Sequence, residues 1–528
     1  MNYRTYPLAG ATAIFTALLV PVWLAAQAQP AVRSGSALHH HYKFVDLGTL
    51  GGPKSLVNGE PSVQVINKAG TVVGVADTSK LTPVPGGFNP IGNPDFFVSH
   101  AFAWRGEGLK DLGTLPGGDY SFAAAINQRG QIAGTSENSK IDPASGNPEF
   151  HAVLWENEGI HDLGTLGGTA SFAATLNDFG QVIGEALNDL PDPLSILGLG
   201  DGTTLTQTHA FLWQNGKMHD LETLGGPDSW AMFVNDRGQV AGTSYTSDVI
   251  DPNTQSPPSD PFLWENGKMK DLGNLGGTNG LLGPQFVQAL NNRGEVVGWM
   301  ALPGDQINHA FLWDGENLSD LGTLGGSWSL ATGINDAGEV AGMAVLPGDQ
   351  VKHAFLWRKG VMTDLGTVPG DPCSFAYNIN SRGQVVGGSQ NAECNPFTHA
   401  VLWENGEPGV DLNTLIPHGA NLQLVVANWI NNRGEIVGLG HDPSCPFEDS
   451  CDAHAYVLIP CDQDHPGVEG CDYDPAHAIT VSDVPPAPIT HRPSPTANET
   501  KSSLAEMMTR FRFMMGGRNL RFEILPRR

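Results

Sequence analysis

Histidine and aspartate recur along this chain at positions that could assemble a metal or acid–base site. Imidazole nitrogens bind transition metals, and neighbouring carboxylates can exchange protons with a substrate. The histidines are His100, His151, His209, His309, His353, His399 and His454. The aspartates are Asp46, Asp111, Asp162, Asp220, Asp271, Asp320, Asp364 and Asp411, each at the start of an Asp-Leu-Gly-Thr-Leu string or a close variant.

Both series supply about one residue to each unit of a repeat, which distributes them around the array instead of gathering them. Recurrence in phase favours a structural hydrogen bond for the histidines, and an aspartate near a strand commonly ties a turn. The sequence therefore predicts no catalytic, cofactor-binding or metal-binding residue in either series.

Tryptophan forms a third series with the spacing of packing between neighbouring units. Its members are Trp104, Trp155, Trp213, Trp264, Trp313, Trp357 and Trp403. Trp230, Trp299, Trp328 and Trp429 fall outside the series. These four are candidates for stacking on a ligand, with burial in the core as the other interpretation.

Calcium is the one cofactor that the acidic residues suggest. Cys461-Asp-Gln-Asp-His and Cys471-Asp-Tyr-Asp supply oxygen ligands, but no full twelve-residue calcium loop is present. We therefore expect no cofactor, and keep Ca²⁺ as the alternative.

The repeat itself predicts the fold. The Asp strings alternate with apolar-Asn-x-x-Gly strings, whose Asn residues are Asn67, Asn127, Asn177, Asn235, Asn291, Asn335, Asn380 and Asn431. A His-Ala-Phe-Leu-Trp-like string follows each, centred on Phe102, Val153, Phe211, Phe262, Phe311, Phe355, Val401 and Tyr456. Each string type occurs eight times, and successive Asp positions are 65, 51, 58, 51, 49, 44 and 47 residues apart. Periods near 50 residues with several strands are typical of β-propellers.

Each unit contains four short strands. In residues 121–166 the expected strands are 121–127, 131–135, 151–155 and 160–166, and the two hairpin turns carry Gly130 and Gly159. Glycine allows the positive φ that tight hairpins require.

The order of strands at the two ends predicts a closed ring. The array begins with an isolated fourth-type strand, 42–50, and ends with a third-type strand, 454–459. The first strand can complete the last blade, and closure removes exposed sheet edges. The expected fold class is all-β, a β-propeller of eight four-stranded blades. A seven-bladed ring is the alternative, with the long first unit and its irregular 88–97 stretch left out.

The strings Asp-Leu-Gly-Thr-Leu-Gly-Gly, Ile-Asn-x-x-Gly-Gln-Val-Val-Gly and His-Ala-Phe-Leu-Trp resemble the HAF family of probable extracellular repeats over about residues 44–459. The resemblance implies export and a repeat architecture, and it implies no substrate or activity. The chain departs from the pattern at Asp260, where other units have His, and at Glu222, where they have Gly. Its last unit lacks the Trp.

The amino terminus predicts export. Residues 1–28 resemble a signal peptide, with Arg4, an apolar run and Ala26-Gln27-Ala28 as the cleavage pattern. An uncleaved anchor is the alternative. Six cysteines suit an oxidising compartment, with neighbours expected to pair: Cys373–Cys394, Cys445–Cys451 and Cys461–Cys471. The predicted location is secreted, extracellular or periplasmic, with no membrane segment left after cleavage.

The expected boundaries are a signal peptide (1–28), a short linker (29–43), the propeller (44–460), a Cys- and Asp-containing segment (461–483), a Pro-rich linker (484–500) and a basic tail (501–528). For the basic tail, the sequence is compatible with a short helix or with a disordered segment. The net charge of −27 makes nucleic acid an unfavourable partner.

Loop lengths predict where a ligand binds. The loops between strands two and three are long (76–99, 136–150, 186–208, 245–260 and 440–453), and they share one face of the ring with the blade junctions. We name this the loop-rich face. The opposite face carries tight hairpins, and we name it the plain face.

Two functions remain open from the sequence. The first is a secreted, monomeric, non-enzymatic scaffold that binds a protein or glycan on the loop-rich face, where loop variation favours binding. The alternative is an extracellular carbohydrate-active hydrolase or lyase with carboxylates at the channel mouth.

Overall fold

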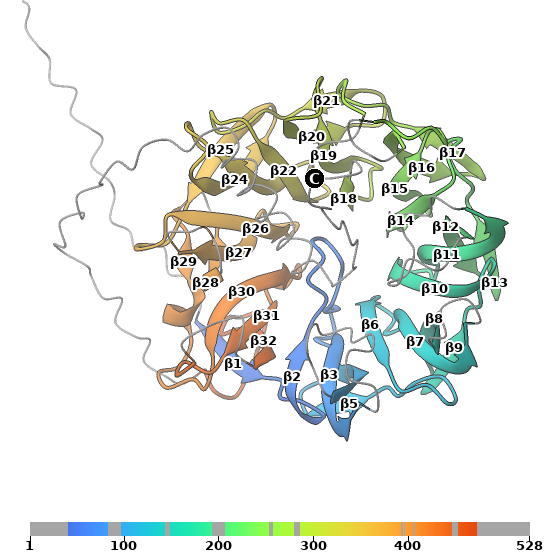
Figure 1. Cartoon of the computed structure of the whole chain (residues 1–528). Helices are drawn as coiled ribbons and strands as arrows, with labels where there is room; N and C mark the ends of the chain where they lie inside the picture. The colour runs from blue at the N-terminus through green and yellow to red at the C-terminus, as the bar shows by residue number, and fades with distance from the viewer. Residues whose placement is uncertain are drawn as a thin grey trace, which may run out of the picture. The chain divides into compact units, whose positions relative to one another are not determined.

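Eight four-stranded antiparallel sheets form a closed ring (Figure 1). The structure is a computed structural model that describes residues 41–82, 97–142, 148–192, 206–252, 257–278, 286–391, 394, 397–404, 407–445 and 452–471. The predicted eight-bladed propeller is confirmed, and the seven-bladed alternative is wrong. The expected signal peptide, Pro-rich linker and basic tail lie outside the described residues, as does the 88–96 part of the irregular stretch.

The first four blades follow the chain order. Blade 1 is β2 (Gly51–Leu56), β3 (Val72–Leu81), β4 (Phe97–Trp104) and β5 (Leu109–Asp111). Blade 2 is β6 (Ser121–Ile126), β7 (Ile132–Ile141), β8 (Pro148–Glu156) and β9 (Gly159–Asp162). Blade 3 is β10 (Gly167–Leu176), β11 (Val182–Pro191), β12 (Thr206–Gln214) and β13 (Lys217–Asp220). Blade 4 is β14 (Ser229–Val234), β15 (Val240–Tyr245), β16 (Ser259–Glu265) and β17 (Lys268–Asp271).

The other four blades have the same plan. Blade 5 is β18 (Phe286–Leu290), β19 (Val296–Ala301), β20 (Asn308–Trp313) and β21 (Leu318–Asp320). Blade 6 is β22 (Ser329–Ile334), β23 (Val340–Val345), β24 (Lys352–Arg358) and β25 (Val361–Gly366). Blade 7 is β26 (Cys373–Ile379), β27 (Val385–Gln390), β28 (Phe397–Trp403) and β29 (Val410–Asp411), followed by the single-turn helix η1 (Leu412–Leu415). Blade 8 is β30 (Gln423–Ile430), β31 (Ile436–His441), β32 (Ala453–Pro460) and β1 (Tyr42–Asp46).

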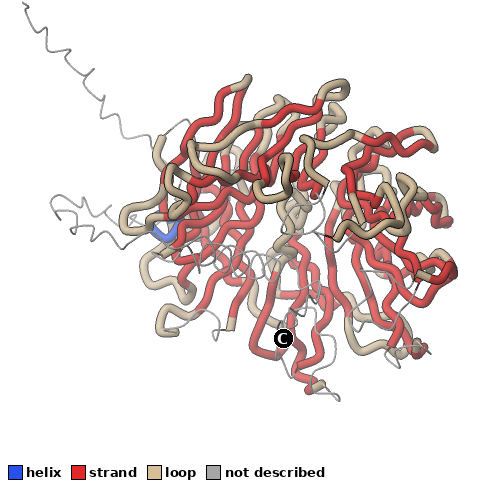
Figure 2. Tube along the Cα trace, turned by 45° about the horizontal axis from the view of Figure 1, so that its top comes forward, coloured by secondary structure: helices blue, strands red, loops and turns tan. Residues whose placement is uncertain are grey.

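The ring is closed by its first strand. β1 pairs antiparallel with β32 from Tyr42 opposite Pro460 to Asp46 opposite Tyr456, so the amino-terminal strand completes the last blade as predicted. Among the described residues, Figure 2 shows strands and loops almost throughout, with η1 as the one helical turn.

Three second strands are longer than the sequence indicated. β3, β7 and β11 each span ten residues, so the first part of the expected loops 76–99, 136–150 and 186–208 is strand. The extensions pack against the chain that enters the same blade. A Cβ on Gly118 would lie 2.0 Å from the Glu137 carbonyl oxygen, which explains the second glycine of that Gly-Gly pair.

A ring of asparagine side chains joins the blades around the channel. The Nδ2 group of each Asn-x-x-Gly asparagine donates to the main-chain carbonyl of the equivalent asparagine in the next blade. The eight bonds measure 3.0–3.5 Å and run Asn67, Asn127, Asn177, Asn235, Asn291, Asn335, Asn380, Asn431 and back to Asn67. We name these eight residues the asparagine girdle.

Each girdle asparagine also holds its own turn. The Oδ1 atom of Asn177 accepts the N–H groups of Phe179 and Gln181 at 3.0 and 3.1 Å. All eight asparagines are buried. A buried amide that loses its partners costs about 1–3 kcal/mol, so the girdle couples each turn to its neighbour.

Replacing a girdle asparagine should weaken the whole ring. Asn177→Ala removes the donor to blade 4 and the acceptor for its own turn, and we expect the apparent free energy of unfolding to fall by about 2–3 kcal/mol. Chemical denaturation measures the change. Asn317→Ala, at an exposed asparagine of blade 5, is the control and should change stability by less than about 0.5 kcal/mol. Equal effects of the two variants would contradict the girdle's role.

Candidate functional site

The recurring histidines and aspartates pair within blades. In six blades the Nδ1 atom of the third-strand histidine lies 2.9–3.0 Å from a carboxylate oxygen of the fourth-strand aspartate. The pairs are His100–Asp111, His151–Asp162, His209–Asp220, His309–Asp320, His353–Asp364 and His454–Asp46. The predicted structural hydrogen bond is confirmed for these six.

The same aspartates tie the turn that follows the fourth strand. Asp162 Oδ1 accepts the N–H of Gly164 at 2.8 Å, and the equivalent bond recurs in the other blades. Burial works to raise the pKa of Asp162, but the bonds from His151 and Gly164 outweigh it and hold that pKa below its usual value. The carboxylate therefore stabilises the fold above about pH 4, and this stability is lost as the pH falls through its lower folded pKa.

Two blades depart from the pairing. In blade 7, His399 bonds Asp371 at 2.7 Å instead of Asp411. In blade 4, Asp260 replaces the histidine, and Asn274 Nδ2 donates to Asp260 at 3.0 Å. Burial, and then the negative charge of Asp271, raise the pKa of Asp260. Two carboxylates therefore lie near each other in blade 4, where six other blades have an attractive His–Asp pair.

Restoring the repeat in blade 4 should stabilise the protein. The double variant Asp260→His/Asn274→Thr recreates the pair with Asp271, and we expect the thermal midpoint at pH 6 to rise by about 1–4 °C. Differential scanning calorimetry measures it, with Asp260→Asn as the control that removes charge without adding imidazole. A midpoint no higher than that of the control would contradict the pairing argument.

The pair at the ring closure joins the two ends of the propeller. His454 Nδ1 lies 3.0 Å from Asp46 Oδ1, across 408 residues of chain. The hydrogen bond to Asp46 opposes the effect of burial and raises the pKa of His454. A raised folded pKa gives stability that is complete below the unfolded pKa of about 6.5 and is lost as the pH rises through the folded value.

The closure should therefore lose stability on the alkaline side of neutrality. We expect the thermal midpoint to fall between pH 6 and pH 8, and to fall less in His454→Gln, which cannot gain the charge. Midpoints recorded at both pH values in one buffer series measure the difference. An identical slope in the two proteins would rule out His454 as the titrating group.

The tryptophan candidates for ligand stacking lie in the core. Trp230, Trp299 and Trp328 are buried, and Trp429 is partly buried. Trp230 packs edge-on against Tyr245 at 5.7 Å between ring centroids. The in-phase series packs between blades as predicted: Trp155 Nε1 donates to the Leu112 carbonyl oxygen of the preceding blade at 3.0 Å.

The segment after the ring is held against the plain face. Cys461 and Cys471 are disulfide-bonded with their Cα atoms 5.6 Å apart, and Cys373 and Cys394 are bonded at 5.3 Å, as predicted. Cys451 lies outside the described residues, so the third pairing stays a prediction. The buried His465 bonds Asp462 at 2.7 Å and lies 3.4 Å from Glu435 of blade 8.

The calcium suggestion is not tested by these contacts. Asp462 is bonded to His465, and Asp464 forms an ion pair with Arg382 at 3.1 Å. Asp472 and Asp474 lie outside the described residues. Within the described ranges, no three His, Cys, Asp or Glu side chains are grouped to hold a metal ion.

An insertion in the first strand of blade 1 crosses the channel, and the sequence analysis missed it. Between Leu56 and Asn67 the chain is longer than in other units, and Figure 1 shows this loop reaching into the middle of the ring. We name residues 57–64 the channel loop. Ser62 Oγ donates to the Thr332 carbonyl oxygen of blade 6 at 2.9 Å, across 270 residues of chain.

Complementary residues receive the channel loop. A Cβ on Gly333 would lie 3.1 Å from Ser62 Oγ, so the smallest residue stands where the loop contacts blade 6. Gln64 Nε2 donates to the Ile126 carbonyl oxygen at 2.8 Å on the other side. Burial, and then the negative charge of Glu60 on this loop, raise the pKa of Tyr377 in blade 7. The loop therefore brings a carboxylate into the channel.

A bulge recurs in the first strands, close to the girdle, and its residues are buried. The register of seven first strands shifts three residues before the girdle asparagine, and the bulge residues are Ala124, Ala174, Met232, Gln288, Thr332, Tyr377 and Asn428. A bulge re-aims a side chain that would otherwise lie in the sheet pattern.

The two faces differ in their balance of charge. Exposed carboxylates lie at or beyond the ends of the second strands on the loop-rich face, among them Asp189, Asp248, Asp349, Asp442 and Asp452. The exposed cations of the described part of that face are Lys80 and Lys140, and Lys80 pairs with Asp119. The plain face carries both signs: its girdle turns hold arginines (Arg129, Arg237, Arg293, Arg382 and Arg433) beside carboxylates such as Asp236 and Asp336.

Comparison with known proteins yields fold-level likenesses. No protein-family model and no curated protein matches the chain, so the resemblance to the HAF family stays a prediction. Solved structures that are similar include the β-propeller domain of the Trilobed protease from Pyrococcus furiosus. It is 11% identical, with a TM-score of 0.39 over 68% of this chain and 98% of that one.

Two enzymes are similar to the same low degree. Oligogalacturonate lyase from Vibrio parahaemolyticus is 8% identical, with a TM-score of 0.35 over 79% of this chain and 97% of that one. An α-L-arabinofuranosidase from Fusarium graminearum is 8% identical, with a TM-score of 0.30 over 80% and 98%. Likenesses this remote transfer no activity. Among the described residues, no helix has the length and apolar character to cross a bilayer.

Proposed function

We propose that this chain is a secreted, non-enzymatic propeller scaffold that binds a positively charged protein on its loop-rich face. The observation that carries the proposal is the excess of exposed carboxylates over exposed cations on the loop-rich face. The ring of eight rigid blades presents these carboxylates on one side, whereas the turns on the other side carry charges of both signs. Opposite charge on a partner accelerates the encounter and fixes its orientation.

The scaffold uses its patterned polar residues to hold itself together. Six histidines pair with aspartates, and eight asparagines form the girdle. Asp349 also has a structural use, because it accepts the N–H of Ser327 at 2.7 Å, as Asp305 does for Thr278 in blade 5. Asp189, near the end of β11, and Asp248, beyond the end of β15, are exposed where a partner can reach them. These loops supply the adaptable surface and the ring supplies its rigidity.

Charge removal on one face tests the proposal. The variant Asp189→Asn/Asp248→Asn/Asp349→Asn loses three charges on the loop-rich face. We expect it to bind an oligolysine peptide of about ten residues roughly fivefold more weakly at low salt. Biolayer interferometry with the immobilised full chain measures the dissociation constant, and the difference should shrink as salt screens the charges.

The matched control removes three charges from the plain face. Glu107→Gln/Glu158→Gln/Glu316→Gln changes exposed hairpin residues and should alter the same dissociation constant less than twofold. Equal weakening by both triple variants would show that only net charge matters, and the loop-rich face would then not be the binding surface.

A further inference from the structure

We infer that a pocket on the plain face, between blades 3 and 4, binds an uncharged sugar ring. The pocket has a volume of about 400 Å³ and lies where the girdle turns of both blades meet the outer hairpin of blade 3. Phe179, Gln181, Gln214, Asn215 and Asp236 line it. The inference is independent of the loop-rich face, because the pocket is on the other side of the ring.

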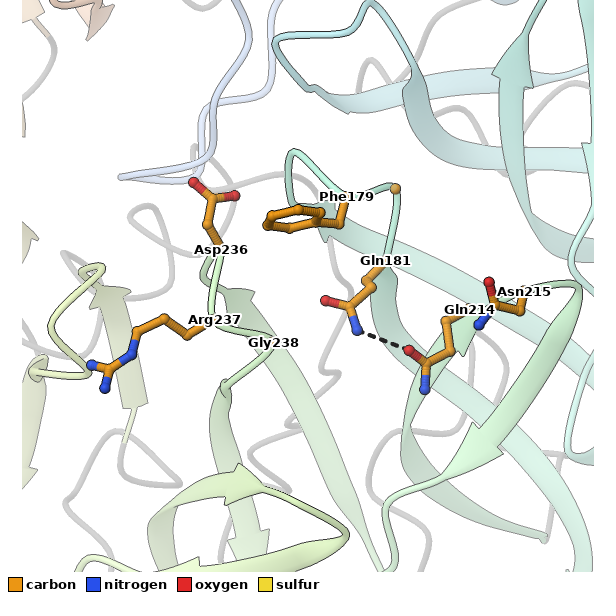
Figure 3. A pocket seen from close by; sticks show the side chains of 8 residues that line it. Phe179, Gln181, Gln214, Asn215, Asp236, Arg237 and Gly238 are labelled. Atoms are coloured by element: carbon orange, nitrogen blue, oxygen red, sulfur yellow. Dashed lines mark hydrogen bonds between the residues drawn. The ribbon is translucent and has the colours of Figure 1, made fainter.

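An exposed aromatic ring forms one wall of this pocket. Phe179 is 68% exposed, and Figure 3 shows its ring between Asp236 and Gln181. The other seven units have alanine or arginine at this turn position: Ala69, Arg129, Arg237, Arg293, Ala337, Arg382 and Arg433. Keeping a phenyl ring in water where the repeat uses a cation or a methyl group gains nothing for folding. A flat apolar face at the mouth of a polar pocket suits stacking on the C–H face of a sugar.

A second departure from the repeat places an amide in the pocket where other blades have a carboxylate. In blades 2, 4 and 7 the equivalent of Gln181 donates to a glutamate: Gln131 to Glu156, Gln239 to Glu265 and Gln384 to Glu404. In blade 3 the acceptor is the amide of Gln214, at 2.9 Å from Gln181 Nε2. An amide oxygen also accepts this bond, and the amide adds two N–H groups that a carboxylate lacks and that can donate to a hydroxyl.

The remaining polar groups select against a charged ligand. Asp236 accepts the N–H of Asp178 through Oδ1 at 3.0 Å, so the second carboxylate oxygen can accept from a sugar hydroxyl. The same negative charge repels an acidic sugar. Arg237, which could have offset it, donates to the Arg293 carbonyl oxygen at 2.8 Å and points away from Phe179 in Figure 3.

Stacking and neutral hydrogen bonding together define the ligand class. The aromatic face matches the apolar face of a neutral hexopyranose or pentopyranose unit in a glycan. The amide donors and the one carboxylate acceptor match the hydroxyl groups around its rim. The girdle holds the turns between the first and second strands of neighbouring blades. The walls of the pocket are therefore fixed before the sugar binds, which lowers the entropic cost of binding.

The test titrates the full chain with cellohexaose, mannohexaose, xylohexaose and hexagalacturonate by isothermal titration calorimetry. We expect at least one of the three neutral hexasaccharides to bind and the uronate not to bind. Phe179→Ala, and Phe179→Arg, which restores the residue of other units, should each weaken that binding at least tenfold. Gln214→Glu should weaken it as well.

Controls separate the pocket from the rest of the ring. Arg293→Ala changes the equivalent turn position in blade 5 and should leave the dissociation constant within twofold. Circular dichroism and the thermal midpoint must be unchanged in every variant that is compared. Absence of binding by all three neutral sugars, binding that survives both Phe179 substitutions, or preference for the uronate would each overturn the inference.

Discussion

The asparagine girdle is the constraint on which the rest of this propeller depends. Within its own turn, Asn177 donates to Gln181 Oε1 at 2.6 Å and its carbonyl oxygen accepts from Gly180 at 3.0 Å. The second N–H of the buried amide then donates to the next blade, and the carbonyl oxygen also accepts from the preceding blade. Eight such links make a circle, and the longest is the 3.5 Å bond from Asn431 to Asn67 at the closure. The circle ties the ends of the first strands to one another. It also fixes the turns that build the plain face.

The outer strands solve a different problem with the His–Asp pair. The fourth strand is short and mostly exposed, as in β9 and β13, so few apolar contacts hold it. The aspartate binds both the histidine of the third strand and the N–H of its own turn, which anchors the strand at its end. Blade 8 uses the pair to join His454 to Asp46, and thereby fastens the amino-terminal strand. The ring is therefore closed twice: by the girdle at the inner strands and by the His454–Asp46 pair at the outer strands.

Most of the architecture could be predicted because the repeat states it eight times. Strand count, closure by the first strand and the structural use of His and Asp all follow from residues in phase. The contact of Ser62 with Thr332 could not be predicted, since it depends on where a single insertion ends in three dimensions. Phe179 was overlooked for a related reason: the plain face was judged from its uniform turn lengths, and length does not show that one turn exchanges an arginine for an exposed ring. Comparing the eight units position by position would have identified Phe179, because it differs from the residue of every other unit.

Strictly repeated positions and variable positions form two kinds of surface. Where the repeat is strict, its polar side chains hold the scaffold together. Where it varies, as in the acidic loops and the turn of Phe179, exposed residues can meet a ligand. Both proposals for binding presuppose a ring that stays closed. Hydrogen exchange followed by mass spectrometry tests this most directly, by comparing β1 and β32 with β25 and β24, the equivalent fourth and third strands of blade 6. The account predicts that β1 and β32 exchange as slowly as their equivalents. Exchange of β1 and β32 within minutes, while β24 and β25 stay protected, would contradict a closed ring.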